Sequence, residues 1–217
     1  IARLLGRLYR ALGLLPSGAI VEVARGDLVG AHIGSTAPKT NERIDAAMGG
    51  VLFIDEAYTL VGGGPQDFGQ EAIETLMPRM ENERGAFLVI AAGYPADMDR
   101  FVASNSGLAS RFTDRIEFLP YTVDELVQIA DSMGRRAGQQ IDDDARVVLR
   151  ERFAAAERAG AFATEGWGNA RQARIVIEAA MKARDLRLSL VEEASAGDLV
   201  ALRADDLNAA FDRHGIG

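Results

Sequence analysis

The chain has 217 residues, with 24 lysines and arginines against 32 aspartates and glutamates, and a formal net charge of −8. Apolar residues make up 48 %, too many for a disordered chain, and the absence of cysteine excludes a disulfide scaffold and fits a reducing cytoplasm. No apolar run approaches the roughly 20 residues of a membrane helix. The acidic balance argues against a nucleic-acid partner.

The N-terminal half alternates helices and strands. The chain opens without methionine, inside an amphipathic helix whose apolar residues follow the helical period up to position 15. We interpret this start as a fragment of a longer protein. Short apolar runs predict strands at 19–23, 51–54, 87–92 and 115–119, and helices are expected at 38–48, 67–83 and 95–102. Such alternation predicts a parallel α/β sheet with right-handed crossovers.

After Pro120 the pattern becomes mainly helical. Thr122 and Glu125 form a capping box that opens a helix to about residue 138. Further helices are predicted at 142–159, 168–190 and 205–213, with a weak strand signal at 198–202. We therefore expect an α/β domain over residues 1–120 and a small helical domain over residues 121–217.

The clearest chemical signal is an apolar run, Val51 to Ile54, followed directly by Asp55 and Glu56. A buried parallel strand that ends this way places both carboxylates where ligands bind in open α/β sheets. In P-loop ATPases an acid at this place holds Mg²⁺, and a following glutamate orients or deprotonates the attacking water. The alternative is a purely structural strand end, in which Asp55 caps the backbone.

A second signal is Arg111, at the end of the segment 104–112. It follows a short helix and precedes a predicted strand, a place from which it can reach a neighbouring subunit. Arginine suits phosphate binding because its fork is bidentate and always charged. The alternative is a surface ion pair with Asp114 or Glu117.

A third signal lies in the segment 168–174, at the start of a helix in the second domain, where Arg171 and Arg174 stand. An arginine at this point can swing onto a bound nucleotide. The alternative is an exposed arginine in an i,i+4 pair, such as Arg174 with Glu178.

Taken together, these motifs resemble the AAA+ ATPases, and within them the branch that contains the rubisco activase CbbX, the type VII secretion ATPase EccA and the stage V sporulation AAA+ protein. The resemblance covers nearly the whole chain. The matching stretches are 27–30, 33–40, 49–58, 69–73, 80–82, 92–94, 104–112 and 169–171.

The resemblance implies a parallel-sheet AAA+ core followed by a helical lid, and it implies ATP and Mg²⁺ as cofactors. Asp55 would be the Walker B metal ligand and Glu56 the catalytic glutamate. Arg111 would be the arginine finger acting in trans, and Arg171 the sensor 2 arginine that contacts the nucleotide. No residue is assigned to sensor 1, whose place falls near Gly93 and Tyr94.

The family also implies a ring, usually a hexamer, that remodels or threads a protein client. The loop containing His32, Ile33 and Gly34 matches the pore loop that grips the client. The family has an aromatic residue where this chain has His32, which offers less apolar area. The alternative is a plain surface loop.

The chain contains no G-x-x-x-x-G-K-[ST] phosphate loop. In the family this loop directly precedes the helix with which this chain begins, so we expect the loop and its strand to lie just upstream. The loop supplies most of the phosphate cradle, so we expect this polypeptide alone to be inactive.

The sequence therefore predicts part of a cytoplasmic ATP hydrolase. The principal alternative is a nucleotide-independent assembly scaffold with a degenerate AAA+ fold, which would need neither Asp55, Glu56 nor Arg111. A DNA-directed motor is disfavoured by the net charge of −8.

Overall fold

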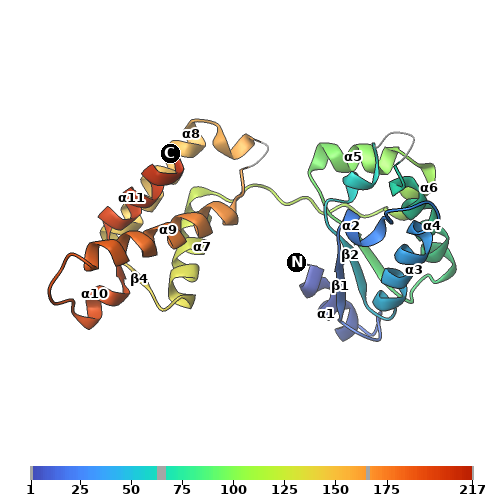
Figure 1. The fold of residues 1–217 in the computed structure, drawn as a ribbon, viewed down its shortest axis with the longest axis horizontal. Helices are drawn as coiled ribbons and strands as arrows, with labels where there is room; N and C mark the ends of the chain where they lie inside the picture. The colour runs from blue at the N-terminus through green and yellow to red at the C-terminus, as the bar shows by residue number, and fades with distance from the viewer. Residues whose placement is uncertain (1, 63–66, 165–166, 217) are drawn as a thin grey trace. The chain divides into compact units, whose positions relative to one another are not determined.

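The computed structural model describes residues 2–62, 67–164 and 167–216. The chain divides into two compact units, Ile1–Glu117 (unit 1) and Phe118–Gly217 (unit 2) (Figure 1). Each has its own hydrophobic core. We describe the two units separately.

Unit 1 is built on a parallel sheet of β1 (Ile20–Val23), β2 (Val51–Ile54) and β3 (Leu88–Ala91), in the order β1-β2-β3. The register pairs Val23 with Ile54 and Ile54 with Ala91, so the strands end level. β2 is central, and this explains why it is the most buried of the three strands. The three strands confirm the predicted runs at 19–23, 51–54 and 87–92.

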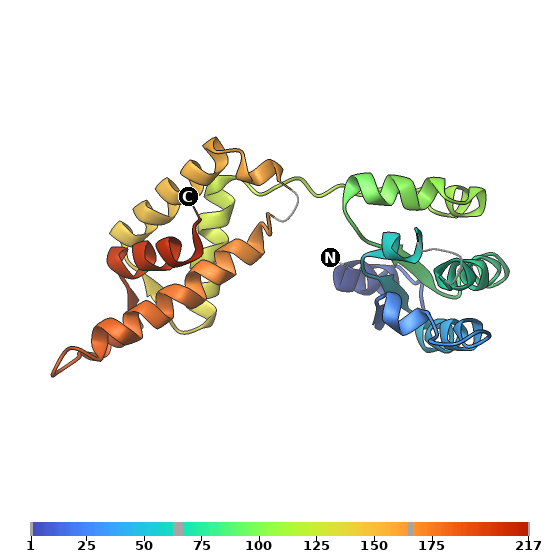
Figure 2. The same cartoon turned by 45° about the horizontal axis from the view of Figure 1, so that its top comes forward.

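Helices cover both faces of this sheet. Because successive parallel strands are joined by right-handed crossovers, the connecting helices lie on one face, and Figures 1 and 2 show α3 and α4 together there, with α1 on the other face. The helical segments of unit 1 are α1 (Ala2–Ala11), α2 (Arg25–Leu28), α3 (Thr36–Ala47), the 3₁₀ helix η1 (Ala57–Leu60), α4 (Gly69–Asn82), α5 (Pro95–Ala103) and α6 (Ser106–Arg111).

The predicted strand at 115–119 is wrong: the structure describes no strand there. A strand needs a neighbouring strand to satisfy its backbone groups, and among the described residues nothing pairs with the free edge of β3. The apolar residues of this run are consequently exposed, with Ile116 at 61 % and Phe118 at 62 %.

Unit 2 is helical, as predicted. Its long helices α7, α8, α9 and α11 bury one apolar cluster, in which Phe153 and Phe211 meet edge to face with ring centroids 5.3 Å apart. The elements are α7 (Val123–Arg136), β4 (Gln140–Ile141), α8 (Asp143–Arg158), η2 (Ala161–Ala163), α9 (Ala170–Leu188), α10 (Ala196–Val200), β5 (Ala201–Leu202) and α11 (Ala204–His214).

Local signals set several boundaries in unit 2. The predicted capping box at Thr122 is present, with its hydroxyl accepting from the Glu125 amide at 3.3 Å and the Glu125 carboxylate accepting from the Thr122 amide at 2.8 Å. The weak strand signal at 198–202 proves half correct, because α10 occupies 196–200 and only 201–202 form β5. The partner strand β4 has no clear sequence signal, being two residues long.

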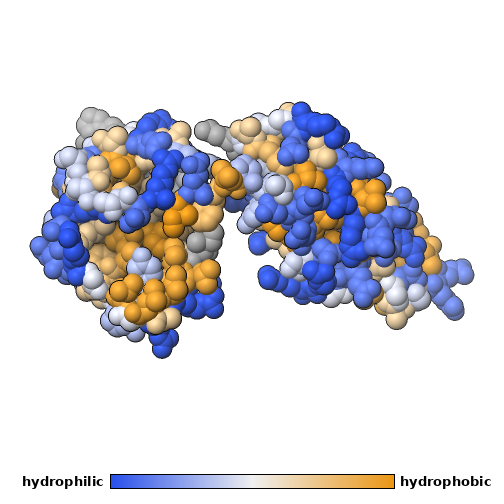
Figure 3. All heavy atoms as spheres, turned by 180° about the vertical axis from the view of Figure 1, so that it is seen from behind, coloured by the Kyte–Doolittle hydropathy of each residue, from blue (hydrophilic) through white to orange (hydrophobic). Residues whose placement is uncertain are grey.

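The surface is not uniform. Figure 3 shows apolar surface gathered on the face of unit 1 that this view presents, whereas unit 2 is more hydrophilic there. Among the described residues, no helix has both the length and the apolar character needed to cross a bilayer.

Candidate functional site

Asp55 and Glu56 follow β2 directly, at the carboxyl end of the central strand, and both are exposed. The Asp55 amide donates to the Val23 carbonyl at 2.8 Å, which continues the ladder one residue beyond β2. Asp55 Oδ1 accepts the Glu56 amide at 3.1 Å. Two carboxylates therefore lie at the carboxyl ends of the strands, where open parallel sheets bind ligands, as the sequence predicts.

The Glu56 backbone is left-handed, with φ 47° and ψ 46°. The 3₁₀ helix that follows holds this conformation, because the Glu56 carbonyl accepts both the amide of Thr59 at 2.9 Å and its hydroxyl at 2.7 Å. The Ala57 amide donates to the Ala92 carbonyl at 3.0 Å, just past β3. The turn that aims the Glu56 side chain is thus tied to both β2 and β3.

Tyr58 lies beside this turn, a neighbour the sequence analysis missed. Its ring centroid is 6.4 Å from that of Tyr94. Burial raises the pKa of the Tyr58 phenol above its usual 10.0, and the charges of Glu56 and Asp97 raise it further, together with a hydrogen bond to Glu56. A neutral phenol is therefore kept next to the candidate catalytic carboxylate.

Gly93, near the place expected for sensor 1, packs against the Tyr58 ring. Gly93 packs so tightly that a Cβ on it would come within 2.7 Å of the Tyr58 ring and 2.8 Å of Met98 Sδ. The segment after β3 therefore needs glycine in order to pack beside η1. Glycine itself offers no side chain that could act as a polar sensor.

Arg111 ends α6 and faces its own unit. Its Nη2 lies 3.3 Å from Glu81 Oε2, and its Nη1 donates to the Gly107 carbonyl at 3.1 Å. Its Nε is buried with no hydrogen-bond partner among the described residues. The ion pair with Asp114 or Glu117 that the alternative reading expected is not among the pairs that the structure gives, and the sequence analysis assigned no role to Glu81.

Arg111 does not meet Asp55 and Glu56 within one unit. Its partner Glu81 lies in the last turn of α4, whereas the first residue of α4, Gly69, packs against the Leu60 carbonyl at the end of η1. Glu81 lies twelve helical steps after Gly69, which corresponds to about 18 Å along the helix axis. The arginine therefore stands at the opposite end of α4 from η1, which follows the two carboxylates.

The predicted pore loop is fully exposed over residues 31–34, and Ile33 shows 90 % of its surface. Ser35 closes the loop, because its hydroxyl accepts the His32 amide at 3.1 Å and donates to the His32 carbonyl at 2.6 Å. Gly34 has a φ of 78°, which suits glycine. The loop thus presents its apolar tip on a short, closed turn.

Arg171 lies in the first turn of α9 in unit 2, and its side chain is exposed. The turn before α9 is tight: the Arg171 amide donates to the Gly168 carbonyl at 2.7 Å. Asn169, just ahead of the helix, has φ 44° and ψ −113°, and its Oδ1 accepts the Tyr121 amide at 3.1 Å. The sequence analysis assigned no role to this asparagine.

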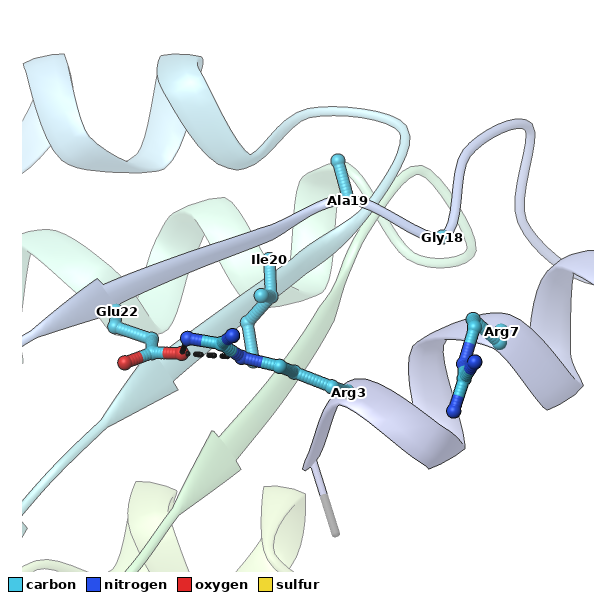
Figure 4. A pocket seen from close by; sticks show the side chains of 6 residues that line it. All are labelled: Arg3, Arg7, Gly18, Ala19, Ile20 and Glu22. Carbon is cyan, nitrogen blue, oxygen red and sulfur yellow. Dashed lines mark hydrogen bonds and ion pairs between the residues drawn. The ribbon is translucent and has the colours of Figure 1, made fainter. Parts of the chain in front are cut away.

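A separate hollow of about 670 Å³ lies between α1 and β1 (Figure 4). Arg3 crosses it to Glu22, with donor–acceptor distances of 2.9 and 2.6 Å, while Arg7 stands apart. None of the predicted site residues lines this hollow, so it does not belong to the candidate site.

Among the described residues, no group of three or more His, Cys, Asp or Glu side chains could hold a metal alone. In proteins Mg²⁺ usually binds one or two carboxylates together with substrate phosphates and keeps several waters. The exposed Asp55 carboxylate, which uses Oδ1 to accept a backbone amide, fits that requirement.

Comparison with known families divides the chain in the same way. The model for "ATPase family associated with various cellular activities (AAA)" matches residues 6–119. The model for "AAA lid domain" matches residues 122–215.

Several curated proteins are similar over nearly the whole chain. The ESX-3 secretion system protein EccA3 of Mycobacterium tuberculosis is 42 % identical over 98 % of this chain and 36 % of that protein. Stage V sporulation protein K of Bacillus subtilis is 38 % identical over 96 % of this chain and 64 % of that protein. The chain thus spans about a third of the mycobacterial relative and under two thirds of the Bacillus one.

Solved structures share the fold at low identity. The Thermotoga maritima RuvB Holliday junction branch migration motor has a TM-score of 0.60 at 18 % identity, covering 89 % of this chain and 52 % of that chain. The FIGL-1 AAA domain has a TM-score of 0.61 at 14 % identity, covering 90 % and 61 %.

Proposed function

Because the chain belongs to the AAA ATPase family, we propose that the full-length protein hydrolyses ATP at the interfaces of a homo-oligomeric ring, a hexamer by analogy with the family. The observation that carries this proposal is the pair of exposed carboxylates, Asp55 and Glu56, at the carboxyl end of the central strand, with Glu56 on a strained and well-tied turn. A scaffold that binds no nucleotide has no need for such a turn.

Asp55 and Glu56 would have different roles in ATP hydrolysis. Asp55 would hold Mg²⁺ together with the phosphate oxygens of ATP, and that ion supplies charge neutralisation on the phosphates. Glu56 would orient the attacking water and accept its proton. The neutral Tyr58 phenol beside it adds no negative charge where the phosphate charge develops.

The two arginines would stabilise the charge that develops on the transferred phosphoryl group. Arg111 would act on the neighbouring subunit, exchanging the Glu81 carboxylate for phosphate oxygens. Its distance along α4 from η1 supports action in trans rather than within its own subunit. Arg171, from unit 2, would contact the nucleotide of its own subunit.

ATP turnover would drive work on a protein client. The exposed turn with His32, Ile33 and Gly34 would contact that client through the apolar Ile33 side chain. The names of the relatives point to a client connected with secretion or with sporulation, and the resemblance adds rubisco. A cytoplasmic location is part of this proposal.

The direct test is Glu56→Gln in the full-length protein. The amide keeps the size of the side chain but cannot accept a proton, so ATP binding should persist while turnover falls at least about a hundredfold. Steady-state ATPase and equilibrium nucleotide binding measure the two effects. Glu74→Gln, an exposed carboxylate on α4, is the matched control and should leave both unchanged. Undiminished turnover in Glu56→Gln would refute the assignment.

A further inference from the structure

Asn169 occupies the N-cap position of α9 but makes no capping hydrogen bond with its side chain. Asparagine is among the best N-cap residues, so a side chain at this position normally accepts from the first turn. Here its Oδ1 instead accepts the Tyr121 amide at 3.1 Å, 48 residues earlier in the chain. The side chain joins the first residues of unit 2 to the start of α9.

The Asn169 backbone is strained as well. In the described residues, Asn169 and Glu56 are the non-glycine positions with positive φ. Such conformations persist where surrounding contacts hold them, and they gather at functional sites. Here the contacts are the Gln172 amide on the Asn169 carbonyl at 3.0 Å and the Arg171 amide on the Gly168 carbonyl at 2.7 Å.

The turn is too compact for a larger residue before Asn169. A Cβ on Gly168 would lie 2.8 Å from the Arg171 Cβ and 3.2 Å from its Cδ. The Arg171 side chain therefore lies over Gly168, and its direction depends on the geometry of this turn. A contact that holds the Asn169 backbone in place therefore also holds the Cβ, Cγ and Cδ atoms of Arg171 in place.

We propose that Asn169 is a positioning residue: by tying Tyr121 to the turn before α9, it sets the direction in which Arg171 meets bound ATP. The proposal rests on the nucleotide-binding role proposed for Arg171. An amide suits this task because it accepts the Tyr121 N–H without placing a negative charge two residues from an arginine that is to bind phosphate.

The chain provides its own reporter. Trp167, the single tryptophan of these 217 residues, stacks on Phe162 with ring centroids 4.6 Å apart and an interplanar angle of 23°. It lies two residues before Asn169, so its fluorescence reports on this turn.

The experiment compares two variants in the full-length protein. Asn169→Gly accepts a positive φ without strain but removes the acceptor, so it separates the side-chain tie from the backbone conformation. Asn169→Asp keeps an oxygen acceptor. Amide hydrogen exchange at Tyr121 should speed up about three- to tenfold in Asn169→Gly, as expected for the loss of one ordinary hydrogen bond, and should stay near the wild-type rate in Asn169→Asp.

ATP binding provides the second measurement, followed by Trp167 fluorescence after any tryptophan outside these 217 residues has been replaced with phenylalanine. Asn169→Gly should weaken equilibrium binding about fivefold, while the thermal unfolding of unit 2 stays within a few degrees of wild type. Wild-type Tyr121 exchange in Asn169→Gly would overturn the proposal. So would faster exchange with unchanged ATP affinity, provided that Arg171→Ala weakens binding.

If Arg171 does not bind the nucleotide, the measurements give a different result. If Arg171→Ala leaves ATP affinity unchanged, then the function proposed for Arg171 is wrong, and the positioning proposal is overturned with it. The exchange rate at Tyr121 still shows whether the tie itself exists, so the two failures can be told apart.

Discussion

The Glu56 side chain owes its direction to a strained, left-handed backbone conformation. A left-handed conformation costs a non-glycine residue about 1 kcal/mol or more. The hydrogen bonds from Thr59 and the ladder contact between Ala57 and Ala92 offset that cost. The backbone conformation thereby sets the direction of the Glu56 side chain, whose carboxylate lies beside the Tyr58 phenol.

Tyr58→Phe tests the environment of this carboxylate. Because the folded-state pKa of Tyr58 is raised, the folded protein disfavours the phenolate. Stability from this group is complete below the unfolded-state pKa near 10 and declines as pH rises through the folded-state value. Tyr58→Phe should therefore lose less stability than wild type above about pH 10, measured by denaturant unfolding at a series of pH values.

Tyr9→Phe, in α1, controls for the loss of a phenol elsewhere in unit 1. Parallel alkaline stability curves for Tyr58→Phe and wild type would show that neither burial nor the carboxylates of Glu56 and Asp97 raise the pKa of Tyr58 in the folded protein.

Part of the candidate site could be predicted from local sequence. Asp55 and Glu56 are recognisable because a continuous apolar run precedes them, which marks a buried strand and its end. Tyr58, Glu81 and Asn169 gave no such signal. Their partners lie on other elements, such as Tyr121 for Asn169, and only folding brings such pairs together.

Among the elements, α7 shows how a local signal sets a helix end. Replacing Thr122 with alanine removes the hydroxyl that accepts the Glu125 amide, and should destabilise unit 2 by about 1 kcal/mol. For a unit of this size that corresponds to a fall of roughly 4–8 °C in its melting temperature, measurable by circular dichroism.

Thr122→Ser retains the hydroxyl and should restore most of the stability. Equal melting temperatures for Thr122→Ala and wild type would mean that water or another acceptor replaces the cap without cost.

The elements also show where sequence reasoning fails. Helices with capping boxes and buried strands with continuous apolar runs are encoded by neighbours in the chain, and these predictions are confirmed. The run at 115–119 has the same apolar character, yet it is not a strand because no described segment pairs with it. Pairing is a property of distant segments, and composition alone does not reveal it.

For the assembled molecule, action of Arg111 in trans predicts complementation. Arg111→Ala and Glu56→Gln should each be nearly inactive. In a mixed ring, a subunit with intact Glu56 can meet a neighbour with intact Arg111, and in an equal mixture about a quarter of head-to-tail interfaces combine both. ATPase activity should therefore reappear on mixing, measured by phosphate release.

The matched control mixes Arg111→Ala with the double variant Glu56→Gln/Arg111→Ala, which offers no intact arginine and should restore nothing. If the first mixture also restores nothing although both variants assemble, Arg111 does not act on a neighbour.

Among the residues that the structure describes, the two hydrophobic clusters have no member in common. Phe101 packs edge to face with Phe112 in unit 1, and Phe153 packs in the same way with Phe211 in unit 2. A substitution that erodes one core therefore leaves the packing of the other intact. In evolutionary terms, the amino-acid sequences of the two cores can change at different rates. A destabilising substitution in one core can be compensated by a second substitution in the same core.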